Sequence, residues 1–228
     1  MKQKITLSVL AFALSVSLAK ANEIRGKVTK DGIGAGGVFV SAHDTENRKA
    51  SGVFTAADGT YVIDELREKD YRVRARQKGL NDVWLEDVTA GSKGIEIKMT
   101  NATGWKLERQ RTADSAFGML KFDDMRDKLN FKMYCTYCHQ VGTVGFRTPE
   151  EPVDWETMIR RMNGFGALYP HTKRTIVKRI MDTYTGKAVD KWPKYAPPSP
   201  PTGAATKAKI TWWEMGKRYE SQYHDIDL

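Results

Sequence analysis

The sequence predicts a two-domain α+β chain, in which an N-terminal antiparallel β-sandwich is followed by an all-α domain. Residues 23–99 alternate between apolar and polar positions with a period of two, and Asp-Gly turn pairs at 31–32 and 58–59 separate the alternating runs. From residue 119 onward, apolar residues recur at helical spacing instead. A length of 228 residues suits two small domains better than one large one.

The first 21 residues have the organisation of a secretory signal peptide. Lys2 and Lys4 precede an uncharged run of 14 residues at 5–18, and Ala19-Lys20-Ala21 places small residues at both cleavage-site positions. That run is short for a bilayer, which needs about 20 apolar residues. We therefore expect cleavage after Ala21, a periplasmic location, and no membrane span in the mature chain.

The charge of the chain narrows the class of partner. The formal net charge is +9, and removal of residues 1–21 leaves 34 basic and 28 acidic residues, a net charge of +6. Lysine and arginine are interspersed with acids, so we expect no nucleic-acid partner. A modest positive charge can steer the chain towards a protein with an acidic docking surface.

The β-sandwich prediction rests on short alternating runs. Val38, Val40 and Ala42 share one face, and Val73 and Ala75 share another. The candidate strands are 23–29, 37–43, 50–55, 60–63, 71–77 and 94–99. These runs show no cluster of acids, histidines or serines, and His43 and Asp44 are interpreted as surface residues near a turn.

Four segments carry a resemblance to a known family. They are 24–28, 36–40, 57–63 and 71–75, and the Asp-Gly-Thr-Tyr run within the third is the most specific. Together they resemble the carboxypeptidase regulatory-like (transthyretin-like) domain. This resemblance implies a seven-stranded sandwich over residues 22–100 with no catalytic residues of its own.

The second half is expected to be helical. A connector at 101–118 leads to a helical pattern at 119–134. Further helices are predicted at about 155–163, with Asp154 as N-cap and Gly164 as stop, and at about 173–184. The helical domain is expected to span 119–190, and a proline-rich linker and tail follow at 191–228.

Cys135-Thr136-Tyr137-Cys138-His139 is the most informative motif of the chain. It is the attachment pattern of a c-type haem, because two thiols at this spacing can each form a thioether to one vinyl group and the next imidazole can bind the iron. A thioredoxin-like dithiol needs a βαβ context, a zinc site needs more ligands, and a disulfide closing so short a loop stabilises little.

The small size of the expected helical domain also favours a covalently held cofactor. Residues 119–186 are expected to form about three helices. So small a core rarely folds without a disulfide, a metal or a bound cofactor to stabilise it. We expect one covalent haem c to provide the apolar body on which these helices pack.

The segments after the motif sharpen this expectation. Residues 155–162, 166–168 and 174–177 resemble a monohaem cytochrome c domain, similar to the haem domains of quinohaemoprotein amine dehydrogenases and of small periplasmic cytochromes c. The resemblance implies that the all-α domain is a cytochrome c domain and that Met162 is the sixth iron ligand. Met158 and His171 are the alternatives, and the glycine-rich run at 163–166 leaves an open sixth position as a further one.

Other residues near the motif have weaker signals. Trp155 is predicted in the core, against the porphyrin edge, and Arg147 is predicted to pair with a haem propionate because a guanidinium suits a carboxylate. A basic stripe of Lys173, Arg174, Lys178 and Arg179 is a candidate docking surface for an acidic redox partner.

The sequence thus predicts a periplasmic electron carrier rather than an enzyme, with the sandwich as a docking or spacing module. No carboxylate pair, Ser-His-Asp set or phosphate loop is evident. Two alternatives remain: a haem enzyme or gas sensor with an open iron position, and a β-sandwich binding protein with an accessory haem.

Overall fold

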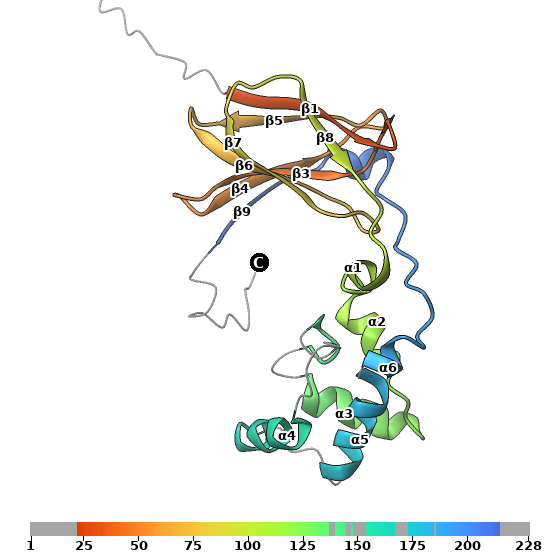
Figure 1. Cartoon of the computed structure of the whole chain (residues 1–228). Coiled ribbons are helices and arrows are strands. Elements are labelled where there is room, and N and C mark those ends of the chain that lie inside the picture. The colour runs from red at the N-terminus through yellow and green to blue at the C-terminus, as the bar shows by residue number, and fades with distance from the viewer. Residues whose placement is uncertain are drawn as a thin grey trace, which may run out of the picture.

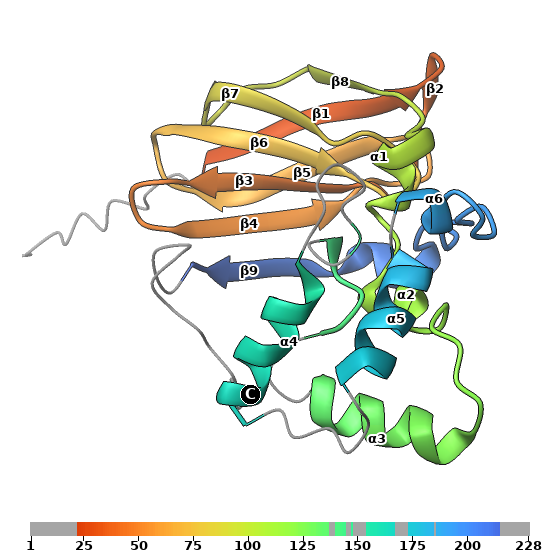
Figure 2. The same ribbon diagram turned by 60° about the horizontal axis from the view of Figure 1, so that its bottom comes forward.

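The structure is a computed structural model, and it describes residues 22–136, 140–144, 147, 154–166, 173–184 and 186–214. Two β-sheets stack face to face, and the helices lie together on one side of this sandwich (Figure 1). The chain enters the helices at α1 and returns to the sandwich at β9, as Figure 2 shows from a second direction.

The first sheet has four strands built around β1 (Asn22–Lys30). β5 (Thr60–Leu66) and the short β2 (Ile33–Gly34) pair with it antiparallel, while β8 (Ile95–Met99) pairs with it in parallel. β8 occupies the opposite edge of β1 from β5, because Gly26 faces Tyr61 on one side and Ile95 on the other.

The second sheet has five antiparallel strands in the order β7-β6-β3-β4-β9. Their bounds are Val83–Thr89, Asp70–Arg76, Phe39–Asp44, Lys49–Phe54 and Lys209–Trp213. β9 comes from the far end of the chain and pairs with β4 from Lys49↔Trp213 to Val53↔Lys209.

The sandwich core follows the predicted alternation. On β3 and β6, Val40, Ala42, Val73 and Ala75 are essentially buried; on β6 the alternating Arg72 and Arg76 are exposed. The core also takes side chains from the opposite sheet: Ile24, Val28, Tyr61, Ile63, Leu66, Ile97 and Met99. Burial of this apolar surface is the main favourable term for this half of the chain.

The helices surround a second, smaller core. They are α1 (Gly104–Glu108), α2 (Ala113–Phe117), α3 (Met125–Cys135), α4 (Trp155–Gly164), α5 (Lys173–Tyr184) and α6 (Gly186–Val189). Their shared cluster, called the helical core below, consists of Ala116, Phe117, Leu120, Phe131, Val141, Ile159, Ile180 and Tyr184. Tyr184 also donates its hydroxyl to the Ala116 carbonyl at 3.1 Å, so its one polar atom is satisfied.

The prediction of a separate all-α cytochrome c domain is wrong. The described chain is mostly β, with nine strands in two sheets and few short helices, and the C-terminal region itself contributes β9. The physical reason is that β4 would otherwise present an unpaired strand edge. Residues 209–213 are rich in β-branched and aromatic side chains, and they satisfy that edge.

The segment from 191 to 208 connects the helices to β9 and is held at several points. Arg111 donates to the Pro193 carbonyl at 2.7 Å, and Glu108 accepts from the Tyr195 backbone N–H at 3.0 Å. Further along, Gly37 has a φ of +72°, and a Cβ there would come within 2.5 Å of the Pro201 carbonyl oxygen. Glycine is therefore required where this connection crosses the sandwich.

Candidate functional site

Helix α3 brings the first motif cysteine to the helical core. Asp124 caps the helix by accepting from the Asp127 N–H at 2.6 Å, and Phe131 is fully buried. Cys135 closes the helix, and its half-buried side chain packs against the helical core. Burial raises the pKa of the Cys135 thiol to about 11, so the free thiol is neutral at pH 7.

Cys138 and His139 lie outside the described residues, and so does the alternative ligand His171. Trp155 is the first residue of α4, but its side chain is outside the described part as well. The predicted haem ligands therefore stay predictions, apart from the placement of Cys135.

The two candidate methionines differ in their surroundings. Both lie on α4 one turn apart and both are half-buried. Met158 packs against the helical core, as Cys135 does, whereas Met162 is not among the residues that contact it. The structure thus brings Met158 to the same cluster as Cys135.

Arg147 is the most deeply buried charged residue among those described, with 1% of its surface exposed. Its two Nη atoms donate to the Glu108 and Arg111 carbonyls at 3.0 and 2.9 Å. Within the described part of the chain, its Nε has no hydrogen-bond partner. Burial lowers the pKa of Arg147, and the charge of Arg111 adds to this effect. The guanidinium therefore braces the α1–α2 connection, and its predicted pairing with a propionate stays untested.

Two residues of the predicted basic stripe on α5, Lys178 and Arg179, are engaged in ion pairs within the chain. Arg179 lies 2.8 Å from the carboxylate of Asp127, with both side chains largely buried, and it stacks over Phe122. Lys178 pairs with Asp182 at 2.5 Å on the outside of the helix. The side chains of Lys173 and Arg174 are outside the described part. Arg179 therefore fixes α5 to α3 rather than offering a charge to a partner.

Aromatic and basic side chains gather on the outer face of the five-stranded sheet. His43 lies between two tryptophans, with ring centroids 5.0 Å from Trp84 and 5.5 Å from Trp212. Arg72 and Arg74 lie over Trp84 at 4.6 and 5.0 Å. Burial lowers the pKa of His43, and the two arginines lower it further. Figures 1 and 2 together show that this outer face is turned towards the helices.

The interpretation of His43 and Asp44 as plain surface residues needs correction. His43 is half-buried in the aromatic group just described, and Asp44 is 6% exposed. Asp44 accepts from Lys69 at 2.8 Å and from the backbone and side-chain amides of Asn47 at 3.1 and 2.7 Å. Asp44 therefore holds the β3–β4 turn together.

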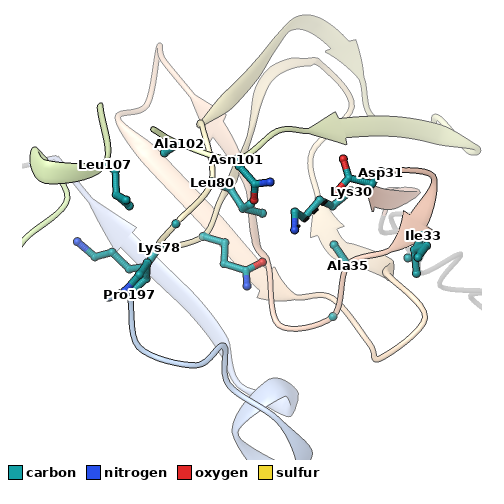
Figure 3. Close-up of a pocket in the computed structure, with 14 residues that line it drawn as sticks. Lys30, Asp31, Ile33, Ala35, Lys78, Leu80, Asn101, Ala102, Leu107 and Pro197 are labelled. Carbon is teal, nitrogen blue, oxygen red and sulfur yellow. Dashed lines mark ion pairs between the residues drawn. The ribbon is translucent and has the colours of Figure 1, made fainter. Parts of the chain in front are cut away.

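A cavity of about 590 Å³ opens at the end of the sandwich next to α1 (Figure 3). Leu80, Ala102, Leu107 and Pro197 form its apolar side. The β1–β2 turn forms the other side, where Lys30 lies 3.6 Å from Asp31. Sequence reasoning missed this site because its walls come from four segments that are far apart in the chain.

Two findings limit other kinds of site. Among the described residues, none of the helices has both the length and the hydropathy that crossing a bilayer would require. In the same part of the chain, histidine, cysteine and acidic side chains nowhere gather in a group of three or more that could bind a metal ion.

Comparison with protein families supports the predicted resemblance of the N-terminal sandwich. Residues 23–100 match the family model of the carboxypeptidase regulatory-like domain, which confirms the predicted resemblance for this segment. No comparison shows a cytochrome c domain in the remainder, and no curated protein matches the chain.

Solved structures show only distant likeness. A type II cohesin–X-dockerin complex of Acetivibrio cellulolyticus is 15% identical, covering 35% of this chain and 58% of that one, with a TM-score of 0.30. A minor pilin of Streptococcus agalactiae is 12% identical over 37% of this chain and 46% of the pilin, also at 0.30. The TIE protein of Bacillus anthracis is 16% identical over 36% and 17% of the two chains, at 0.29. This chain thus spans less than two thirds of each of them.

Proposed function

We propose that this chain is an exported one-electron carrier, in which Cys135, Cys138 and His139 hold a single c-type haem. The observation that carries the proposal is the Cys-x-x-Cys-His motif, which begins at the last residue of α3, with Cys135 packed against an apolar cluster. The basic start and uncharged run of residues 1–18 support export, and haem attachment of this kind takes place after export in bacteria. The carboxypeptidase regulatory-like sandwich would then dock or space the carrier.

The surroundings of Cys135 fit a flat apolar group. Met133 and Tyr134, the two residues before it, are 56% and 36% exposed. A small helical core that leaves large apolar side chains at its surface gains stability when a further apolar body covers them. These side chains and Met158 would bury one face of the group and exclude water from it.

The role of each chain residue follows from its chemistry. When bound, the haem supplies the one-electron redox chemistry. Cys135 and Cys138 would hold it by two thioethers, and the His139 imidazole would bind the iron from one side. Met162 remains the first candidate for the other side by resemblance, and Met158 is supported as the alternative because it packs against the same helical core as Cys135. A thioether at that position stabilises ferrous iron and raises the potential.

The test is attachment in cells that export the full chain and contain a haem-maturation system. We expect the purified chain to be coloured, and its mass to exceed that of the mature polypeptide by one haem. Cys135→Ser with Cys138→Ser should abolish both signals. Thr136→Ala, at a variable position inside the motif, is the matched control and should keep them. A colourless wild-type chain of unmodified mass would refute the proposal.

The axial ligand and the open-site alternative need a second measurement. Met158→Leu and Met162→Leu should differ, with only one of them removing the methionine-to-iron absorption band near the red edge of the visible spectrum. Rapid and complete binding of carbon monoxide by the reduced wild-type protein would instead support an open sixth position, and with it the sensor or enzyme alternative.

A further inference from the structure

A second cavity, of about 390 Å³, lies where the sandwich meets α1. We call it the junction cavity. Its walls come from the end of β6 and the loop after it, from α1 and the turn that follows, and from Val144. Five basic side chains line it: Arg76, Lys78, Lys106, Arg109 and Arg111. Among the described residues of the lining, Asp82 is the one carboxylate, so basic side chains outnumber acidic ones there.

The nearby acids are already engaged with other cations. Asp82 accepts from Arg74 and lies 3.8 Å from Arg76, and Glu108 bonds to Arg111 at 2.9 and 3.1 Å. Lys106 and Arg109 have neither an ion pair nor a side-chain hydrogen bond within the described residues. Two cations with unused donors therefore face a cavity whose described lining offers no further carboxylate.

Arg147 provides an independent observation. Its guanidinium is almost completely buried, faces only backbone carbonyls, and keeps an Nε without a partner in the part of the chain that the structure describes. A buried cation whose hydrogen bonds go only to neutral carbonyls is unfavourable, and the charge of Glu108 offsets this only in part because burial and Arg111 still lower the pKa of Arg147. Its influence reaches the cavity: burial and the charge of Arg76 lower the pKa of Lys78, Asp82 opposes them, and Arg147 adds a smaller lowering. A bound anion would relieve this repulsion.

The floor of the junction cavity is held rigidly. Gln110 accepts from the Gly79 N–H at 2.7 Å and donates to the Leu80 carbonyl at 2.8 Å, while its own backbone carbonyl accepts from Lys78 at 2.6 Å. These bonds fix the loop after β6 against the end of α1. The Lys78 ammonium and the loop that carries it are thus preorganised, which lowers the entropy that a ligand must overcome on binding.

We propose that the junction cavity binds a small phosphate-bearing anion that bridges the sandwich and the helices. Arginine forks and lysine ammonium groups converging from different segments are the donors that phosphate oxygens take best. The side-chain amide of Gln77 in the lining adds a neutral donor. The volume lies in the range of small-molecule sites and exceeds what inorganic phosphate alone would fill. This site is independent of the proposed haem.

The test is a calorimetric titration of the full chain with inorganic phosphate at constant ionic strength. Glycerol phosphate, citrate and chloride serve as the comparison ligands. We expect phosphate to bind, glycerol phosphate to bind at least as tightly, and chloride to give no heat. Lys106→Gln with Arg109→Gln should weaken phosphate binding about tenfold or more, since two charged donors are lost. Both residues are exposed on a short helix and its end, so the fold should survive.

Matched controls separate the site from general charge effects. Lys93→Gln with Arg126→Gln removes the same two charges from exposed positions outside the cavity and should leave phosphate binding unchanged. Near-ultraviolet circular dichroism checks that each variant is folded. Equal responses to phosphate and chloride, equal losses in both double variants, or tighter binding of citrate than of phosphate would each overturn the proposal.

Discussion

Asp44→Asn tests how the sandwich stabilises its β3–β4 turn. Asp44 is 6% exposed and accepts hydrogen bonds from Lys69 and from both amides of Asn47. Burial alone would raise the pKa of Asp44, but these hydrogen bonds outweigh it and lower the pKa from 3.8 to about 2. The substitution keeps the shape of the side chain and removes its charge.

The size of the effect follows from this shift. Each pKa unit corresponds to about 1.4 kcal/mol, so the ionised form gains at most about 2.5 kcal/mol in the folded state. Lys69 is one fifth exposed, and solvent screens part of its interaction with Asp44. We therefore expect Asp44→Asn to lower the free energy of unfolding by about 1–2 kcal/mol at pH 7.

The sign of the pH dependence is fixed by the direction of the shift. A carboxyl with a lowered folded pKa contributes stability above its unfolded value of 3.8, and that contribution is lost as the pH falls to about 2. Urea unfolding of both proteins, followed by tryptophan fluorescence, gives their free energies of unfolding at pH 7, 4 and 2. The difference between the two proteins should become smaller as the pH falls. Asp31→Asn, at an exposed turn position, is the control and should have little effect. An equal difference at pH 7 and pH 2 would refute the reasoning.

Three further substitutions probe the contacts that join the parts of the chain. Trp212→Ala should speed proteolytic release of the C-terminal segment about tenfold, since it removes ring contacts of β9, whereas the exposed Trp213→Ala should change the rate little. Arg179→Met leaves Asp127 buried beside an apolar side chain and should cost about 3 kcal/mol in urea unfolding of the helices; a loss below 1 kcal/mol would contradict a buried ion pair. Gly26→Ala would place a Cβ 2.1 Å from a β8 carbonyl oxygen, so we expect a thermal midpoint at least about 5 °C lower, and an unchanged midpoint would show that β1 and β8 are not so closely paired.

The local patterns of the sequence predicted several elements well. The helix expected at about 155–163 is found at Trp155–Gly164, and Asp154 caps it by accepting from the Thr157 N–H at 3.0 Å. The helix expected at 173–184 is found over the same range. The start and end of a helix depend on capping residues, glycine stops and apolar spacing within a few residues of each other. These signals can therefore be interpreted without knowledge of the fold.

Elements that depend on distant partners were missed. β7 carries few strongly alternating residues, and β9 lay in what the sequence indicated as a tail. Each forms because a strand already in the sheet offers an unpaired edge: β6 for β7, and β4 for β9. The positions of Asp44 and Arg147 also depend on partners elsewhere in the chain, so no local pattern identifies them as buried.

The sequence by itself determined the chemistry on which the proposed function rests, namely two thiols and an imidazole at one fixed spacing, together with the alternation that builds a sandwich. Only the tertiary structure decided that the C-terminal segment closes a sheet, that Met158 shares a cluster with Cys135, and that basic residues from β6 and α1 surround one cavity. The reason is that the spacing of side chains along the chain depends only on the order of consecutive residues. Sheet edges, burial and charge imbalance arise only when segments far apart in the chain are brought into contact.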